Sequence, residues 1–268
     1  MSAIDQLFAR LKKEGRKALM PFITAGDPDL DFTAALLGEL VRRGSHLCEL
    51  GIPYSDPIAD GPVIQASYTR ALERHIKLAG VLDMLGSVTP DLAAPVVTMV
   101  SYAVVYRHGL KQYAADVQAA GVAGLIVPDL PVEESEPLAD VCRAAGLSLI
   151  QLVTPTTSRE RVLRIAELST GFLYYVSVVG ITGERQELPL ELVDNVAWLR
   201  EQTPLPICIG FGISQPEQVK MLGAVADGVI VGSAIVRRIA QAADRPHDEV
   251  LAEVGNYAAS LVAALESH

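Results

Sequence analysis

The 268-residue chain has few cysteines, few aromatic residues and no excess of positive charge. Its three cysteines, Cys48, Cys142 and Cys208, lie far apart among apolar neighbours. This spacing argues against a disulfide framework and indicates reduced thiols in the core of a cytoplasmic protein. Because 22 basic residues stand against 32 acidic ones and form no basic stripe, we do not expect nucleic acid as a partner.

Long hydrophobic runs are also missing. No apolar stretch is long enough to cross a bilayer, so we expect no membrane association. The first 17 residues have the pattern of an amphipathic helix with mixed charge and lack the apolar centre of a signal peptide. These features again favour a cytoplasmic location.

Several common catalytic groups are absent from the positions where a site would need them. No lysine falls at the end of a predicted strand, which disfavours a Schiff-base aldolase. None of the five histidines pairs with another histidine or a cysteine at metal-ligand spacing, so no metal site is expected. No GxGxxG follows the first apolar run, which argues against dinucleotide binding. The remaining candidates for chemistry are carboxylates, without metal or cofactor.

Short apolar runs alternate with longer amphipathic segments along the whole chain. Each run is rich in β-forming residues and ends in a turn signal, as expected of parallel strands buried on both faces. The eight runs begin near Ala18, Leu47, Pro95, Ala123, Leu147, Phe172, Pro206 and Asp227. Eight βα units in about 250 residues predict an α/β fold, a (β/α)₈ TIM barrel, in a single domain over residues 1–268. An open doubly wound sheet is the main alternative.

Helical periodicity predicts further elements around this barrel. Extra helices are expected outside it at Ile4–Lys13 and Pro246–Glu266. One helix is expected over Val132–Ala145, with acidic residues in its first turn. The patterns Thr157-x-x-Glu160 and Ser214-x-x-Glu217 have the form of capping boxes that open a helix.

The segment Leu47–Gln65 carries the most informative polar residues. Glu49 lies inside an apolar strand, where burial should raise the pKa of its carboxyl group, and Asp56 and Asp60 follow in a loop. Two acids in unlike environments are suited to acid–base catalysis. The structural alternatives are a buried ion pair for Glu49 and a helix cap near Pro62 for Asp60. Asp56 is interpreted as a loop or interface residue without a chemical role.

Glycine-rich turns follow the last predicted strands. Gly210–Ser214 and Val231–Ala234 come after the seventh and eighth strands, where barrels hold phosphate on backbone N–H groups at a helix N-terminus. Gly180–Gly183, after the sixth strand, would add further donors. Glycine also occurs in ordinary tight turns, so one such loop would be weak evidence for phosphate binding. Two loops in the expected positions make the prediction stronger.

The segments PFITAGDPD, ELGIPYSDPIADGPVIQ, VPDLPVEES, YYVSVVGITG, IGFGIS and VGSAIV occur in this order. Together they resemble the alpha subunit of tryptophan synthase, and the resemblance covers nearly the whole chain. It implies a carbon–carbon lyase that cleaves indole-3-glycerol phosphate to indole and D-glyceraldehyde 3-phosphate, a retro-aldol step in tryptophan biosynthesis. Glu49 matches the family's general acid–base residue, and Asp60 matches the carboxylate that stabilises the indole N–H.

The resemblance also implies a set of substrate-binding positions. Tyr174 would orient the catalytic glutamate, Thr182 would close over Asp60, and Phe22 and Phe211 would form apolar walls, although core packing is the alternative for both phenylalanines. Tyr102 follows the third strand, as a tyrosine does in the family. The phosphate-binding positions are matched by Gly183, Gly212, Gly232 and Ser233.

The family works with a beta subunit, and the resemblance implies an α2β2 assembly in which only that partner holds pyridoxal phosphate. The run Ser101–Gly109 departs from the family pattern, because it keeps Tyr102 but lacks the asparagine that usually follows. In the family this loop faces the beta subunit. Two alternatives stay open: a non-catalytic barrel that only activates a partner enzyme, and a lyase that works alone.

Overall fold

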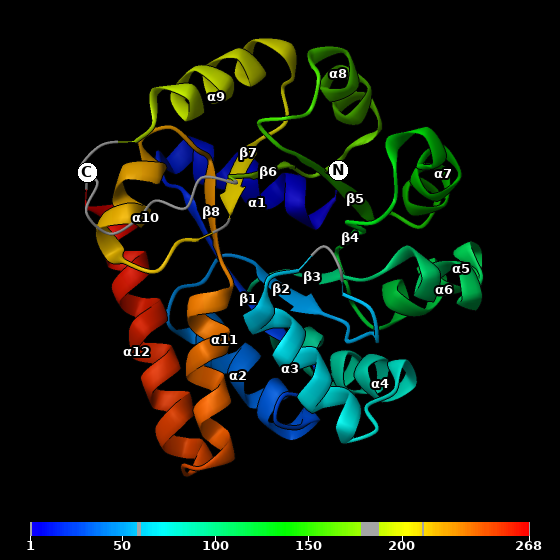
Figure 1. Ribbon diagram of the computed structural model, residues 1–268, viewed down its shortest axis with the longest axis vertical. Helices are drawn as coiled ribbons and strands as arrows, with labels where there is room; N and C mark the ends of the chain where they lie inside the picture. The colour runs from blue at the N-terminus through cyan, green and yellow to red at the C-terminus, as the bar shows by residue number, and fades with distance from the viewer. Residues whose placement is uncertain (1, 58–59, 178–187, 211, 268) are drawn as a thin grey trace.

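The computed structural model describes residues 2–57, 60–177, 188–210 and 212–267. Its strands all run parallel and close into a barrel in chain order, with β8 hydrogen-bonded to β1 (Figure 1). The strands are β1 Ala18–Thr24, β2 Cys48–Gly51, β3 Val96–Met99, β4 Gly124–Ile126, β5 Ser148–Val153, β6 Leu173–Val176, β7 Ile207–Gly210 and β8 Gly228–Val231. The predicted (β/α)₈ barrel is therefore confirmed, and the open sheet is wrong.

Helices surround the barrel (Figure 1). The α-helices that the structure describes are α1 Ala3–Glu14, α2 Leu30–Arg42, α3 Pro62–Glu73, α4 Leu78–Val88, α5 Tyr102–His108, α6 Leu110–Ala119, α7 Glu136–Ala144, α8 Arg159–Leu168, α9 Leu190–Gln202, α10 Pro216–Gly223, α11 Ser233–Ile239 and α12 His247–Glu266. Short 3₁₀ turns lie at η1 Thr89–Asp91, η2 Val132–Glu134 and η3 Ala240–Ala243. The two additional terminal helices, α1 and α12, are confirmed.

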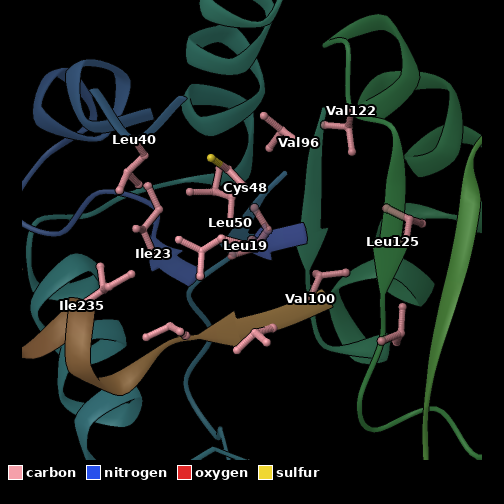
Figure 2. Close-up of a cluster of buried hydrophobic side chains, with 14 of the residues drawn as sticks. Leu19, Ile23, Leu40, Cys48, Leu50, Val96, Val100, Val122, Leu125 and Ile235 are labelled. Atoms are coloured by element: carbon pink, nitrogen blue, oxygen red, sulfur yellow. The ribbon is translucent and has the colours of Figure 1, made fainter. Parts of the chain in front are cut away.

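The strands separate two apolar layers, because successive side chains point to opposite faces. In β1, Leu19 and Ile23 point outward into the layer beneath the helices, part of which is drawn in Figure 2. Met20 and Phe22 belong to the second layer, inside the barrel. All seven residues of β1 are buried, which explains why the run has no polar alternation.

Helix α1 packs against the barrel end at which the strands begin. Its side chains Ile4, Leu7, Phe8 and Leu11 are buried in the inner layer, and the Phe8 ring lies 5.8 Å from that of Phe172. Its first turn carries a reciprocal cap between Ser2 and Asp5. The amino end of the barrel is thus covered by apolar contacts, and the carboxyl ends of the strands remain for a site.

The single helix predicted over Val132–Ala145 is wrong. The segment forms the 3₁₀ turn η2 and then α7, which begins at Glu136. Pro137 explains the break, because proline has no N–H and is tolerated only in the first turn of a helix. A helix that began at Val132 would place this proline where a donor is required.

Both predicted capping boxes are also wrong, each by one residue. The residue that precedes α8 is Ser158, and the Thr157 hydroxyl instead accepts from the backbone N–H of Thr154 at 3.0 Å. Helix α10 begins at Pro216 after Gln215, whose backbone N–H donates to the side chain of Gln218 at 3.0 Å. In α10, the fixed φ of Pro216 suits the first helical position and so shifts the cap by one residue.

The three cysteines are buried and free, as predicted. Among the helices that the structure describes, none is both long and apolar enough to cross a membrane.

An ion pair links the loop after β1 to α3. The Arg70 guanidinium donates to both oxygens of Asp27, with Nε–Oδ1 at 2.9 Å and Nη2–Oδ2 at 2.6 Å. The Asp27 side chain is 3% exposed and that of Arg70 is 32% exposed. Because α3 follows the acidic loop, this pair fixes the helix that leads away from Asp60.

We expect Arg70→Met to lower the free energy of unfolding by about 2 to 3 kcal/mol, because it leaves the buried Asp27 carboxylate uncompensated. Arg143→Met is the matched control, since Arg143 pairs with Asp140 at 60% and 66% exposure and should change stability by about 0.5 kcal/mol or less. Urea denaturation measures both values. Equal losses in the two variants would contradict the structural role of the Asp27 pair.

Candidate active site

Glu49 lies in the middle of β2 and faces the barrel interior. Its register partners are Phe22 on β1 and Val97 on β3, which both belong to the inner layer. The residue is 1% exposed, and its Oε1 has no hydrogen-bond partner among the described residues. Burial, reinforced by the charge of Asp60, raises the pKa of Glu49 to about 8. The rise predicted from the sequence is confirmed, and no ion pair offsets it within the described ranges.

Asp60 lies at the carboxyl ends of the strands, two residues before the first residue of α3. The residue that precedes this helix is Gly61, which makes no side-chain cap, so the alternative of a capping role for Asp60 is wrong. The Tyr54 hydroxyl donates to Asp60 Oδ2 at 3.4 Å. Burial raises the pKa of Asp60 to about 6, the Tyr54 hydrogen bond opposes the rise, and the charge of Asp129 adds to it. At neutral pH Asp60 is therefore mainly ionised while Glu49 is mainly protonated.

One pocket brings most of the predicted site residues together. It is lined by seven of them: Phe22, Glu49, Asp60, Tyr174, Gly212, Gly232 and Ser233. The sequence analysis missed its other lining residues: Gly61, Ile64, Met99, Ile213 and Ile230. Most of these missed residues are apolar and could not be distinguished in the sequence from core residues.

The pocket has one acidic side and one side formed by backbone. Gly232 precedes α11, so the first N–H groups of that helix, beginning with Ser233, adjoin the pocket. Gly212 has a φ of 71°, a left-handed conformation that favours glycine. Backbone N–H groups at a helix start attract anions without a lysine, so this side can hold a phosphate group.

Other predicted residues lie elsewhere. Tyr102 does not line the pocket; its backbone N–H donates to Asp129 at 2.7 Å, and its ring lies 5.9 Å from that of Tyr106. Asp56 is exposed and accepts a hydrogen bond from Ser55. The predicted positions Thr182, Gly183 and Phe211 lie outside the described residues.

A match to a protein family gives this pocket its context. The family model described as tryptophan synthase alpha chain matches residues 8–265. The chain belongs to the tryptophan synthase alpha chain family. This membership confirms the resemblance seen in the sequence and associates the chain with the enzymes of tryptophan synthesis.

Individual relatives agree with the family match. A tryptophan synthase alpha chain of Rhodopirellula baltica is 55% identical, with all of both chains covered. One from Synechocystis is 50% identical over 90% of this chain and 92% of its own. Among solved structures, the tryptophan synthase alpha subunit of Legionella pneumophila has a TM-score of 0.91 at 36% identity, with all of both chains covered.

A larger cavity lies at the opposite end of the barrel and does not include Glu49 or Asp60. Its volume is about 410 Å³, and its lining includes Lys17, Arg200 and Asp227. Both of these cations pair with Asp227, at 3.7 Å and 3.0 Å. In barrels of this kind the active site lies at the carboxyl ends of the strands, so the smaller acidic pocket is the candidate site. Within the described ranges, no cluster of histidine, cysteine or carboxylate residues is arranged to hold a metal ion.

The buried acid should make stability fall as pH rises. The folded protein keeps the Glu49 proton up to a pKa of about 8, whereas the unfolded chain loses it near 4.5. The contribution of the Glu49 proton to the free energy of unfolding is therefore complete below pH 4.5 and is lost as the pH rises through 8. Between these values, we expect Glu49→Gln to gain about 1.4 kcal/mol per pH unit in unfolding free energy relative to wild type.

Urea denaturation at pH 5, 6, 7 and 8 measures this difference. Glu136→Gln, which changes an exposed glutamate on α7, is the control and should follow the wild type at every pH. A constant difference between Glu49→Gln and wild type would show that Glu49 titrates normally in the folded protein.

Proposed function

We propose that this chain cleaves indole-3-glycerol phosphate to indole and D-glyceraldehyde 3-phosphate. The observation that carries the proposal is the pocket in which Glu49 and Asp60 face the backbone cradle at Gly212, Gly232 and Ser233. Its acids suit a retro-aldol reaction, and its cradle suits a phosphate. Membership of the alpha chain family supports the same substrate.

Glu49 would move both protons of the reaction. Its protonated carboxyl group donates to C3 of the indole ring, which converts the ring to its cationic form. The resulting carboxylate then accepts the proton of the glyceryl hydroxyl, and the carbon–carbon bond breaks as the aldehyde forms. The bonding electrons return to the ring, and Glu49 ends protonated. A pKa of about 8 keeps this acid close to the working pH in both roles.

Asp60 would stabilise the charge that develops during this step. Protonation at C3 places positive charge on the ring nitrogen, and an ionised carboxylate that accepts a hydrogen bond from the indole N–H lowers the energy of that state. A pKa of about 6 leaves Asp60 mainly ionised at neutral pH, and the Tyr54 hydroxyl helps to orient it. The two acids therefore have different tasks because their surroundings differ.

The remaining lining would position the substrate. Phe22, Ile64 and Ile230 provide apolar surface for a flat ring, while the N–H groups near Gly232 and Ser233 receive the phosphate. Binding at both ends would hold the bond to be cleaved beside Glu49. Such orientation converts binding energy into rate.

The natural context that we propose is an α2β2 assembly with a beta subunit that holds pyridoxal phosphate. Solved relatives include the tryptophan synthase of Mycobacterium tuberculosis, whose matching chain has a TM-score of 0.88 at 28% identity. In this chain, α5 presents Tyr106 at 70% exposure, in the region that departs from the family pattern. A stand-alone lyase is therefore the alternative to test.

We expect the purified chain to release indole from indole-3-glycerol phosphate, and more rapidly with its beta subunit present. Glu49→Gln should lower kcat by a factor of about 10³ or more while substrate still binds, because it removes the group that carries both protons of the proposed reaction. Asp60→Asn should also lower kcat, since it removes the ionised group beside the ring. Indole release and substrate binding are measured separately.

The exposed Glu136→Gln variant serves as the control and should retain activity. A wild-type chain that binds the substrate but releases no indole, with or without the beta subunit, would reject the lyase and favour a partner-activating barrel. Equal activity in both conditions would indicate the stand-alone enzyme.

A further inference from the structure

Tyr68 on α3 is a buried residue without an assigned role. It is 1% exposed and packs in the inner apolar layer with Phe22 and Tyr174. Its hydroxyl has no hydrogen-bond partner among the described residues. Buried polar groups are nearly always paired, so an unpaired phenol in the barrel interior requires an explanation.

The backbone of Gly51 shows where this hydroxyl lies. A Cβ on Gly51 would come within 2.6 Å of Tyr68 Oη and 2.5 Å of the Phe22 ring, so these groups occupy the place of a side chain at that position. Gly51 follows Glu49 by two residues in β2, and residues two apart in a strand share a face. The Tyr68 hydroxyl therefore lies on the same face of β2 as Glu49.

The titratable groups that influence Tyr68 are Asp60, Tyr54 and Glu49, in that order, and burial together with their charges raises its pKa well above the ordinary value. Tyr68 therefore remains a protonated donor. The Tyr54 ring lies 5.4 Å from that of Tyr68, and its hydroxyl already serves Asp60. Within the part of the chain that the structure describes, Glu49 Oε1 has no donor and is free to accept a hydrogen bond.

We propose that Tyr68 is a positioning residue for Glu49, whose carboxylate accepts a hydrogen bond from the Tyr68 hydroxyl once the Glu49 proton has been transferred. Tyr68 does not line the pocket, so it acts through Glu49 and does not contact the substrate. A hydrogen bond to the charged form stabilises that form. This role rests on the proposed reaction, in which Glu49 alternates between acid and carboxylate.

The test is Tyr68→Phe, which removes only the hydroxyl. Infrared difference spectra between each protein and its Glu49→Gln counterpart, recorded across pH without substrate, give the Glu49 pKa. We expect Tyr68→Phe to raise that pKa by about one unit. It should also lower kcat about tenfold with little change in KM, because the carboxylate loses a partner and the pocket keeps its lining.

Tyr113→Phe is the matched control. Tyr113 on α6 is also fully buried, but it lies in the outer layer, where its hydroxyl neighbours the side chain of Thr98 and no acid of the pocket. It should leave both the Glu49 pKa and kcat unchanged. Incorporation of 3-fluorotyrosine at position 68 keeps the ring, makes the hydroxyl a stronger donor, and should lower the Glu49 pKa.

An unchanged Glu49 pKa in both position-68 variants would overturn the proposal, as would an equal shift in Tyr113→Phe. The infrared measurement does not depend on turnover. A shifted pKa in a protein that never releases indole would therefore support the Tyr68–Glu49 contact and reject the proposed reaction instead.

Discussion

Closure of the parallel barrel is the constraint on which the rest of the structure depends. Because every strand runs in the same direction, all carboxyl ends meet at one end of the barrel and all amino ends at the other. The interior is filled by inward side chains, and α1 covers the amino end with apolar contacts. The acidic loop and the glycine-rich turns converge at the carboxyl end, where the active sites of such barrels are built.

Within this frame, depth separates the two acids. Glu49 belongs to a strand and is buried in the barrel interior, whereas Asp60 belongs to a loop at the edge and accepts a hydrogen bond from the Tyr54 hydroxyl. A carboxyl group thus has a pKa of about 8 at Glu49 and of about 6 at Asp60. A buried acid without a hydrogen-bond partner destabilises the folded state. Such acids occur mainly at functional sites.

Close packing around Glu49 depends on two glycines. Gly51 leaves room for Tyr68 and Phe22, and a Cβ on Gly210 would come within 2.5 Å of the Tyr174 hydroxyl. Both glycines end strands, β2 and β7, so both tyrosines can enter the barrel at the level of the pocket. A larger residue at either position would force the neighbouring ring away. The aromatic surroundings of Glu49 therefore depend on these two glycines as well as on the tyrosines.

The sequence by itself determined the eight strands, the barrel and the acidic motif, because uninterrupted apolar runs are typical of parallel strands buried on both faces. Local pattern failed beside prolines. Pro137 is tolerated only in the first turn of α7 and so divides the helix predicted over Val132–Ala145, and Pro216 takes the first position of α10 and so shifts its cap. Only the tertiary structure decided which residues share the pocket. Ile64 and Tyr68 both lie on α3, and the sequence does not distinguish their roles. In the structure Ile64 lines the pocket, whereas the Tyr68 hydroxyl lies against Gly51, on the face of β2 that carries Glu49. Such neighbours come from distant segments whose contacts no local pattern records.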